Sequence, residues 1–112
     1  MAKRLLERDI ERHLVKRVKE LGGEVRKVQW VGRAGAPDRL VMLPANLLRM
    51  WCNLPSKKPH TIWVELKNPE TIRTFPANAH ERAQAREHER MRNLGQRVVV
   101  IGTIEQVEEM LA

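Results

Sequence analysis

The segment at residues 61–67 limits the possible folds more than any other part of the chain, because its apolar and polar residues alternate strictly. One face of the segment would carry Ile62, Val64 and Leu66, and the other Trp63, Glu65 and Lys67. Alternation with period two is typical of a half-buried strand. The pattern therefore predicts a strand on which two charged groups, Glu65 and Lys67, share a face with a tryptophan.

Three further segments indicate strands. Residues 24–31 mix apolar and polar side chains in a short run, which favours a first strand. Residues 38–43 end in four apolar residues directly before Pro44, too few for a helix, and predict a largely buried strand. Residues 97–101 contain a β-branched run that is typical of an interior strand.

Two long segments predict helices. In residues 3–21 an apolar residue recurs every three or four positions, which places one buried stripe on a helix. That stripe consists of Leu6, Ile10, Leu14, Val18 and Leu21. Gly22 and Gly23 would end this helix, and Gly95 would end a second helix over residues 79–94.

The remaining segments complete the order helix, three strands, helix, strand, helix. Residues 104–111 are amphipathic and predict the closing helix. Residues 32–37 and 68–78 predict loops, the second because it contains two prolines. Residues 45–60 indicate an excursion with one helical turn, longer than a tight hairpin needs. No repeat is visible, so we expect residues 1–112 to form a single α/β domain.

Charge and cysteine content narrow the class of protein. The chain has 21 Lys and Arg against 14 Asp and Glu, a net charge of +7 that favours a polyanionic partner such as nucleic acid. The single cysteine, Cys52, allows no intrachain disulfide, so we expect a cytoplasmic protein. Because no run of about 18 apolar residues occurs, we expect neither secretion nor a membrane span.

Asp38, Glu65 and Lys67 match the needs of phosphodiester hydrolysis. Metal-dependent nucleases use carboxylates to hold Mg²⁺ or Mn²⁺ and a cation to position water or stabilise the transition state. Asp38 opens the second strand, and it can approach Glu65 if the second and third strands pair antiparallel. The open alternative is that Glu65 and Lys67 form only the solvated face of an edge strand.

Four motifs follow one another along the chain. They are Glu11 on the first helix, G-x-P-D at Gly35 to Asp38, V-E-x-K at Val64 to Lys67, and Gln84 on the second long helix. This combination resembles the VRR-NUC family, the virus-type replication-repair nucleases of the PD-(D/E)xK superfamily, over nearly the whole chain. Further agreement lies in Lys27, in Leu94 with Gly95, and in Glu105 and Val107 after the last strand.

The resemblance implies a restriction-endonuclease-like fold, an αβββαβ core with a mixed central sheet flanked by helices. It also implies that Asp38, Glu65 and the backbone carbonyl of Leu66 bind Mg²⁺ or Mn²⁺. Glu11 would supply another carboxylate, directly or through water. Lys67 would orient water or stabilise developing negative charge.

Residue spacing leaves the roles of Glu11 and Gln84 open. Glu11 lies at the margin of the buried stripe, where it could face the active edge of the sheet or pair with neighbouring arginines. Gln84 shares a helical face with His88 and Met91. It could therefore reach the sheet to bond a ligand water or a phosphate, or remain a surface glutamine.

Several basic residues are candidates for DNA contact. Lys27 and Arg33 would lie near the proposed metal site, and Lys57 and Lys58 fall in the excursion. A further basic stripe recurs every four residues at Arg82, Arg86 and Arg90. Because glutamates are interleaved with this stripe, a salt-bridged solvent face is equally compatible with it.

The histidines and tryptophans have less specific patterns. The four histidines, His13, His60, His80 and His88, lack the spacing of zinc ligands, so we interpret them as solvated or packing residues. The three tryptophans are Trp30, Trp51 and Trp63. They could stack on bases, but in a chain with one Phe and no Tyr we interpret them as core anchors.

Together these observations predict an Mg²⁺- or Mn²⁺-dependent DNA endonuclease with Asp38, Glu65, Lys67 and Gln84 at its catalytic centre. The resemblance further implies action on branched or four-way junction DNA in phage or viral replication or repair, by a homodimer that places two sites on one junction. Two alternatives stay open: a catalytically silent DNA-binding module and an RNA-directed nuclease of the same fold.

Overall fold

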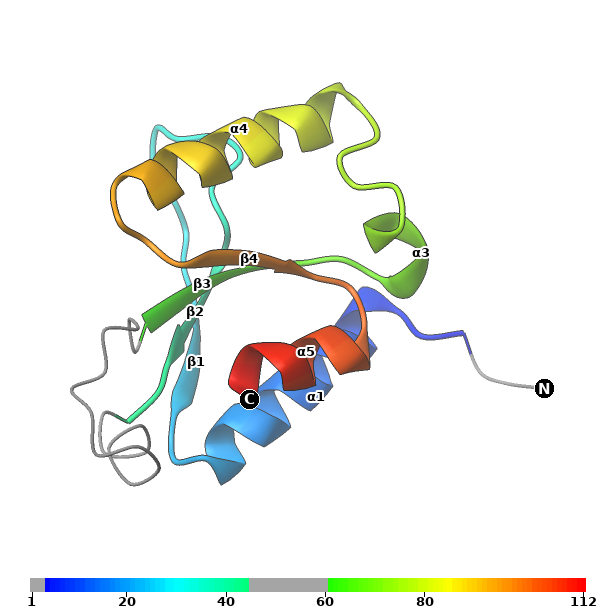
Figure 1. Ribbon diagram of the computed structural model, residues 1–112, viewed down its shortest axis with the longest axis vertical. Coiled ribbons are helices and arrows are strands. Elements are labelled where there is room, and N and C mark those ends of the chain that lie inside the picture. The colour runs from blue at the N-terminus through cyan, green and yellow to red at the C-terminus, as the bar shows by residue number, and fades with distance from the viewer. Residues whose placement is uncertain (1–3, 45–60) are drawn as a thin grey trace.

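A four-stranded sheet lies between helices on both of its faces (Figure 1). The computed structural model describes residues 4–44 and 61–112. One long helix, α4 (Ala79–Asn93), covers one face, and α1 (Glu7–Glu20) and α5 (Ile104–Leu111) cover the other. The predicted α/β architecture with a mixed sheet and flanking helices is confirmed.

The strands follow one another across the sheet in chain order. They are β1 (Glu24–Lys27), β2 (Arg39–Met42), β3 (Thr61–Leu66) and β4 (Val98–Ile101). The first three pair antiparallel, whereas β4 runs parallel to β3. A parallel neighbour requires a crossover connection, and α4 lies within this one. The strand β3 is therefore an interior strand with a neighbour on each side.

The apolar face of β3 forms the centre of the hydrophobic core. Its side chains pack with residues of α1, β4 and α5 in one cluster. The fully buried members include Ile10, Leu14, Val18, Ile62, Val64 and Val107. Burying each such side chain stabilises the fold by roughly 1.5–3 kcal/mol. The predicted stripe on the first helix is correct in its middle, but Leu6 lies before the helix and is exposed.

The helix α4 buries polar residues against the opposite face of the sheet. Its buried positions are Glu81, Gln84, Glu87, His88 and Met91. The helix begins where the side chain of Asn78 accepts a hydrogen bond from the backbone N–H of Glu81 at 2.8 Å. It ends before Gly95, which has a φ of 87°. A helix with four buried polar side chains indicates that this face of the sheet serves a purpose other than core packing.

Two sequence predictions are wrong, one about a connection and one about the first strand. Residues 68–78 were expected to be a loop, yet they contain a short helix, α3 (Pro69–Ile72). Proline is tolerated in the first turn of a helix, and Asn68 caps this one by accepting from the backbone N–H of Thr71 at 2.7 Å. The first strand, expected over residues 24–31, ends at Lys27.

The first helix was expected from residue 3, whereas it begins at Glu7. The other predicted segments agree with the structure within one or two residues at their ends, where helices and strands commonly fray. The predicted excursion at residues 45–60, with its lysines Lys57 and Lys58, lies outside the described residues. Among residues 4–44 and 61–112, none of the helices combines the length and the apolar character that a membrane span requires.

Candidate active site

The antiparallel pairing of β2 and β3 brings Asp38 opposite Glu65. Arg39 pairs with Val64 in the ladder, so the residue before Arg39 lies across from the residue after Val64. The antiparallel pairing of the second and third strands, on which the sequence made the approach of Asp38 to Glu65 conditional, is therefore confirmed. The side chain of Asp38 is largely exposed, whereas Glu65 is only 9% exposed.

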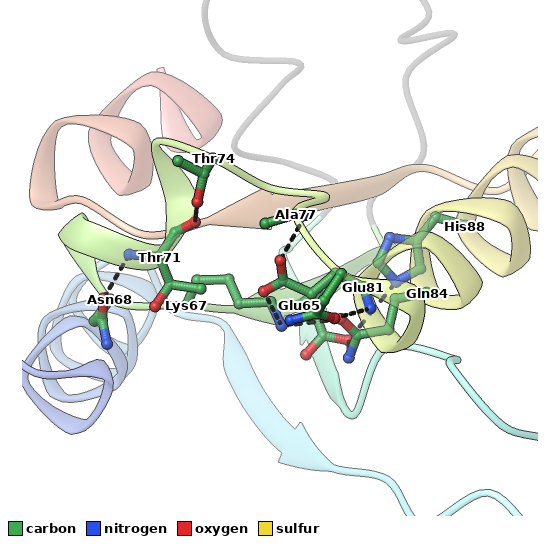
Figure 2. A network of polar contacts seen from close by, with 10 residues as sticks. Glu65, Lys67, Asn68, Thr71, Thr74, Ala77, Glu81, Gln84 and His88 are labelled. Carbon is green, nitrogen blue, oxygen red and sulfur yellow. Dashed lines mark hydrogen bonds and ion pairs between the residues drawn. The ribbon is translucent and has the colours of Figure 1, made fainter.

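Glu65 and Lys67 point from β3 toward the polar face of α4 (Figure 2). The amide nitrogen of Gln84 donates to a carboxylate oxygen of Glu65 at 3.4 Å, and Nε2 of His88 lies 3.6 Å from the same oxygen. Because β3 is an interior strand and little of either charged side chain is exposed, the alternative of a solvated edge strand is wrong.

Lys67 is held by three groups. Its ammonium donates to the amide oxygen of Gln84 at 2.9 Å, lies 3.7 Å from a carboxylate oxygen of Glu81, and sits 5.3 Å from the centre of the Phe75 ring. Gln84 therefore accepts from Lys67 and donates to Glu65 with one amide group (Figure 2). Since Gln84 is only 8% exposed, the alternative of a surface glutamine is also wrong.

Arg39 links the first helix to Asp38. Its guanidinium bonds the carboxylate of Glu11 on α1 and lies 2.9 Å from a carboxylate oxygen of Asp38. The sequence alternative for Glu11, a pair with Arg8 or Arg12, is wrong, because the partner is Arg39. The Arg39 guanidinium thus binds carboxylates from two parts of the chain, and its positive charge offsets the repulsion between them.

Glu7 is a second carboxylate of α1 that lies close to these groups. Burial raises the pKa of Glu7 above its usual value; the ammonium of Lys67 lowers it, and the carboxylates of Glu65 and Asp38 raise it. Glu7 therefore lies within electrostatic range of these three charged groups. It stands one helical turn before Glu11, and that spacing could have identified it in the sequence.

The loop before Asp38 is fixed against α4. Gly35 has a φ of 83°, and a Cβ there would lie 3.1 Å from the backbone oxygen of Ala83. Arg33 donates from Nε to the buried carboxylate of Glu87 at 2.9 Å. This pairing leaves half of the Arg33 side chain exposed, and the predicted contact of Arg33 with DNA stays a prediction.

Comparisons with known proteins show which family the chain belongs to. No family model matches the chain. The chain is 35% identical over 100 residues to "Putative nuclease p44" of Acyrthosiphon pisum secondary endosymbiont phage 1, covering 88% of this chain and 85% of that protein. A solved VRR_NUC domain superimposes with a TM-score of 0.66 at 32% identity, covering 94% of this chain and 92% of the other. The chain belongs to the VRR-NUC family. Its fold is accordingly the restriction-endonuclease-like fold that the sequence predicted.

The VRR-NUC site offers oxygen donors that suit a hard divalent cation. Asp38, Glu65 and Glu11 provide carboxylates, and Leu66 can offer only its backbone carbonyl because its hydrocarbon side chain has no donor atom. Within the described ranges, no three carboxylate, histidine or cysteine side chains converge closely enough to hold a metal ion. A bound ion would replace the guanidinium of Arg39 as the partner of the carboxylates of Asp38 and Glu11. The donor chemistry therefore fits Mg²⁺ or Mn²⁺.

Three residues of this VRR-NUC site escaped the sequence reasoning besides Glu7. Arg39 and Glu81 are charged residues whose partners come from distant segments, so local spacing could not reveal them. His88 is fully buried and stacks on Phe75 with ring centres 6.3 Å apart. Its interpretation as a packing residue holds, although the contact with Glu65 was not foreseen.

The basic stripe on α4 contains both paired and unpaired arginines. Arg90 bonds Glu87 at 3.0 Å, and the neighbouring Arg92 lies 3.6 Å from Glu89. Arg82 and Arg86 have no ion pair among the residues that the structure describes. The salt-bridged alternative therefore applies to the C-terminal part of the helix only.

Proposed function

We propose that this protein is an Mg²⁺- or Mn²⁺-dependent DNA endonuclease that hydrolyses phosphodiester bonds. One observation carries the proposal: Glu65 and Lys67 leave an interior strand side by side, opposite Asp38, and are joined by the amide of Gln84. Membership of the VRR-NUC family and the phage relative named as a nuclease support it.

In this proposal Asp38, Glu65 and the backbone carbonyl of Leu66 hold the metal, and a carboxylate of α1 completes the set. The candidates are Glu11, which pairs with Arg39, and Glu7, one helical turn earlier on α1. A bound divalent ion supplies positive charge for the phosphate and lowers the pKa of a water molecule. The chain contributes the paired strands β2 and β3 and the helix α1, which bring these ligands to one region of the fold.

Lys67 places a positive charge beside the scissile phosphate. Glu81 and Gln84 hold its ammonium in one position, and both side chains are themselves buried. A cation fixed in a partly dehydrated site stabilises negative charge more strongly than one in water. Lys67 can therefore orient the attacking water or neutralise charge as the phosphorus becomes pentacoordinate.

Branched DNA is the substrate class that we propose, in phage or viral replication or repair. The net charge of +7 favours a polyanion with closely spaced phosphates. The relative comes from a phage. A homodimer would present two sites to two of the four strands of a four-way junction. The competing functions are cleavage of RNA by the same fold and DNA binding without catalysis.

The test is cleavage of labelled four-way junction, flap, single-stranded and linear duplex DNA, and of matched RNA, with Mg²⁺, Mn²⁺ or EDTA. Lys67→Ala is the inactive variant, and Glu109→Gln, on the exposed face of α5, is the control. We expect metal-dependent cutting of branched DNA by the wild type and the control alone. Tight binding without cutting of any substrate would contradict the proposal in favour of the silent module.

A further inference from the structure

An open groove begins at Asp38 and extends along the end of β1. Its volume is about 600 Å³, within the range of roughly 300–1,000 Å³ that small-molecule sites occupy. Lys27, Trp30 and Arg33 line it together with Asp38 and Arg39. A ligand in this groove would therefore lie directly beside the proposed catalytic carboxylate.

Trp30 is an exposed tryptophan that its surroundings hold in place. Its indole N–H donates to the backbone oxygen of Pro37 at 2.7 Å, and its ring lies 5.1 Å from the ring of Trp63 at a 48° tilt. The residue is nevertheless 36% exposed, so the interpretation of Trp30 as a core anchor is wrong. Because the indole nitrogen is already bonded, the part left for a ligand is the aromatic surface.

The cations of the groove differ in their availability. Arg33 and Arg39 are engaged by carboxylates. Lys27 is exposed and, within the described part of the chain, has no ion pair or hydrogen-bonding partner for its ammonium. It stands opposite Arg39 in the β1–β2 ladder, one residue from Asp38. The groove thus combines an aromatic surface with one free cation.

We propose that this groove binds the nucleotide next to the scissile phosphate in unpaired form, with its base stacked on Trp30 and its phosphate contacted by Lys27. The inference rests on the proposed function. Aromatic side chains stack on any exposed base, and lysines bind phosphates as point charges. A base inside a duplex has both faces covered, so only an unpaired nucleotide can use Trp30. The enzyme would then cut where a strand leaves a duplex, at flaps and branch points.

The experiment replaces single nucleotides of a flap substrate by an abasic sugar, one position at a time on each side of the cut. For the wild type we expect kcat/KM to fall about tenfold at one of the two adjacent positions, a typical loss for one base stack. At positions two or more nucleotides away the substitution should have little effect.

Variants of Trp30 give a second measurement. Trp30→Ala should lower kcat/KM about tenfold on the intact substrate. Removal of the critical base should lower kcat/KM of this variant no further, whereas Trp30→Phe should keep most of the activity. Far-ultraviolet circular dichroism checks that both variants fold. Because Trp30 also bonds Pro37 beside Asp38, the abasic series with the wild type remains the decisive test.

The outcomes separate this inference from the proposed function. If the wild type cuts intact and abasic substrates equally well, the groove does not bind a base and the inference is wrong, while the nuclease activity stands. If none of the substrates is cut with either metal, the proposed function fails. Additive losses from Trp30→Ala and the abasic sugar would also contradict the inference, since independent effects add.

Discussion

Glu87 is a buried carboxylate that bonds two arginines from different parts of the chain. Arg33 reaches it from the loop before Asp38, and Arg90 from the next turn of α4. The hydrogen bond from Arg33 is the main cause that holds the pKa of Glu87 below its usual value, and burial opposes it. Glu87 therefore binds its arginines as an anion and links the loop to the helix.

This arrangement predicts a pH-dependent contribution to stability. Because the pKa of Glu87 is lowered in the folded protein, the contribution is complete above the carboxyl's ordinary value of 4.5 and is lost as the pH falls below it. Glu87→Gln should lower the melting temperature by roughly 5 °C at pH 7. The difference from the wild type should shrink toward zero in acid.

Thermal unfolding followed by circular dichroism between neutral and acidic pH measures this difference. Glu89→Gln is the matched control, because Glu89 lies on the exposed side of the same helix. A melting-temperature difference for Glu87→Gln that stays constant across the titration range would show that the charge of Glu87 is not what binds the loop.

The residue scale also shows where sequence reasoning reaches its limit. Asp38, Glu65 and Lys67 could be predicted because motif order and strand period place them together. Arg39 and Glu81 could not, since their partners come from distant segments of the chain. Local periodicity defines the faces of an element, whereas a partner from a distant segment is fixed only by tertiary packing.

At the scale of elements, the contact between the 32–37 loop and α4 sets the geometry of the site. Gly35 approaches the backbone of Ala83 and Gln84 so closely that a side chain there would force the loop away. The helix carries Gln84, which bonds both Glu65 and Lys67, and the loop leads into Asp38. Any separation of loop and helix would therefore move Asp38 relative to the other groups.

Gly35→Ala tests this contact, and Gly32→Ala is the matched control. Both glycines have positive φ, 83° and 72°, so each alanine adds backbone strain of about 1–3 kcal/mol. Only Gly35 has neighbours, because a Cβ at Gly32 meets nothing within 4 Å. We expect Gly35→Ala to lose cleavage activity at least tenfold beyond Gly32→Ala.

The comparison requires kcat/KM for both variants and urea unfolding for their stability. Equal activity in the two variants, at measurable stability, would mean that the close packing of the loop on α4 does not position the catalytic groups.

Elements were predictable to the extent that their signals were local. The stripe of α1 and the alternation of β3 predicted both elements and their buried faces, because periodicity alone defines them. The short helix α3 was missed because Pro69 was interpreted as a breaker. Proline breaks the interior of a helix but fits its first turn, and only the cap by Asn68 distinguishes the two cases.

At the scale of the whole molecule, the excess of basic residues should govern DNA affinity. Lys27, Arg82 and Arg86 are free of ion pairs among the described residues, and Lys27 and Arg33 flank the proposed site. Phosphate contacts release counterions from DNA, so binding weakens as salt increases. Affinity is therefore expected to depend on ionic strength more than on base sequence.

For the inactive Lys67→Ala protein on flap DNA, we expect the Kd to rise about 1,000-fold between roughly 50 and 200 mM salt, as for six or more phosphate contacts. Fluorescence anisotropy measures this dependence. Lys27→Met should reduce the slope of log Kd against log salt by about one. A Kd that is independent of salt would exclude phosphate contact as the main source of affinity.

The measurement that tests the central claim most directly is single-turnover cleavage of the preferred DNA as a function of Mn²⁺ concentration. Wild type, Glu65→Gln and Lys67→Ala are compared, with Glu109→Gln as the control. Substitution of a metal-binding carboxylate should change the Mn²⁺ requirement, whereas substitution of a positioning cation should not, because only the carboxylate binds the ion.

We expect Glu65→Gln to need much more Mn²⁺ and to lose most of its rate, and Lys67→Ala to lose about 100- to 1,000-fold in rate with an unchanged Mn²⁺ requirement. The control should match the wild type throughout. Full metal-dependent cleavage by Glu65→Gln would contradict the account, because the catalytic centre would then lie elsewhere.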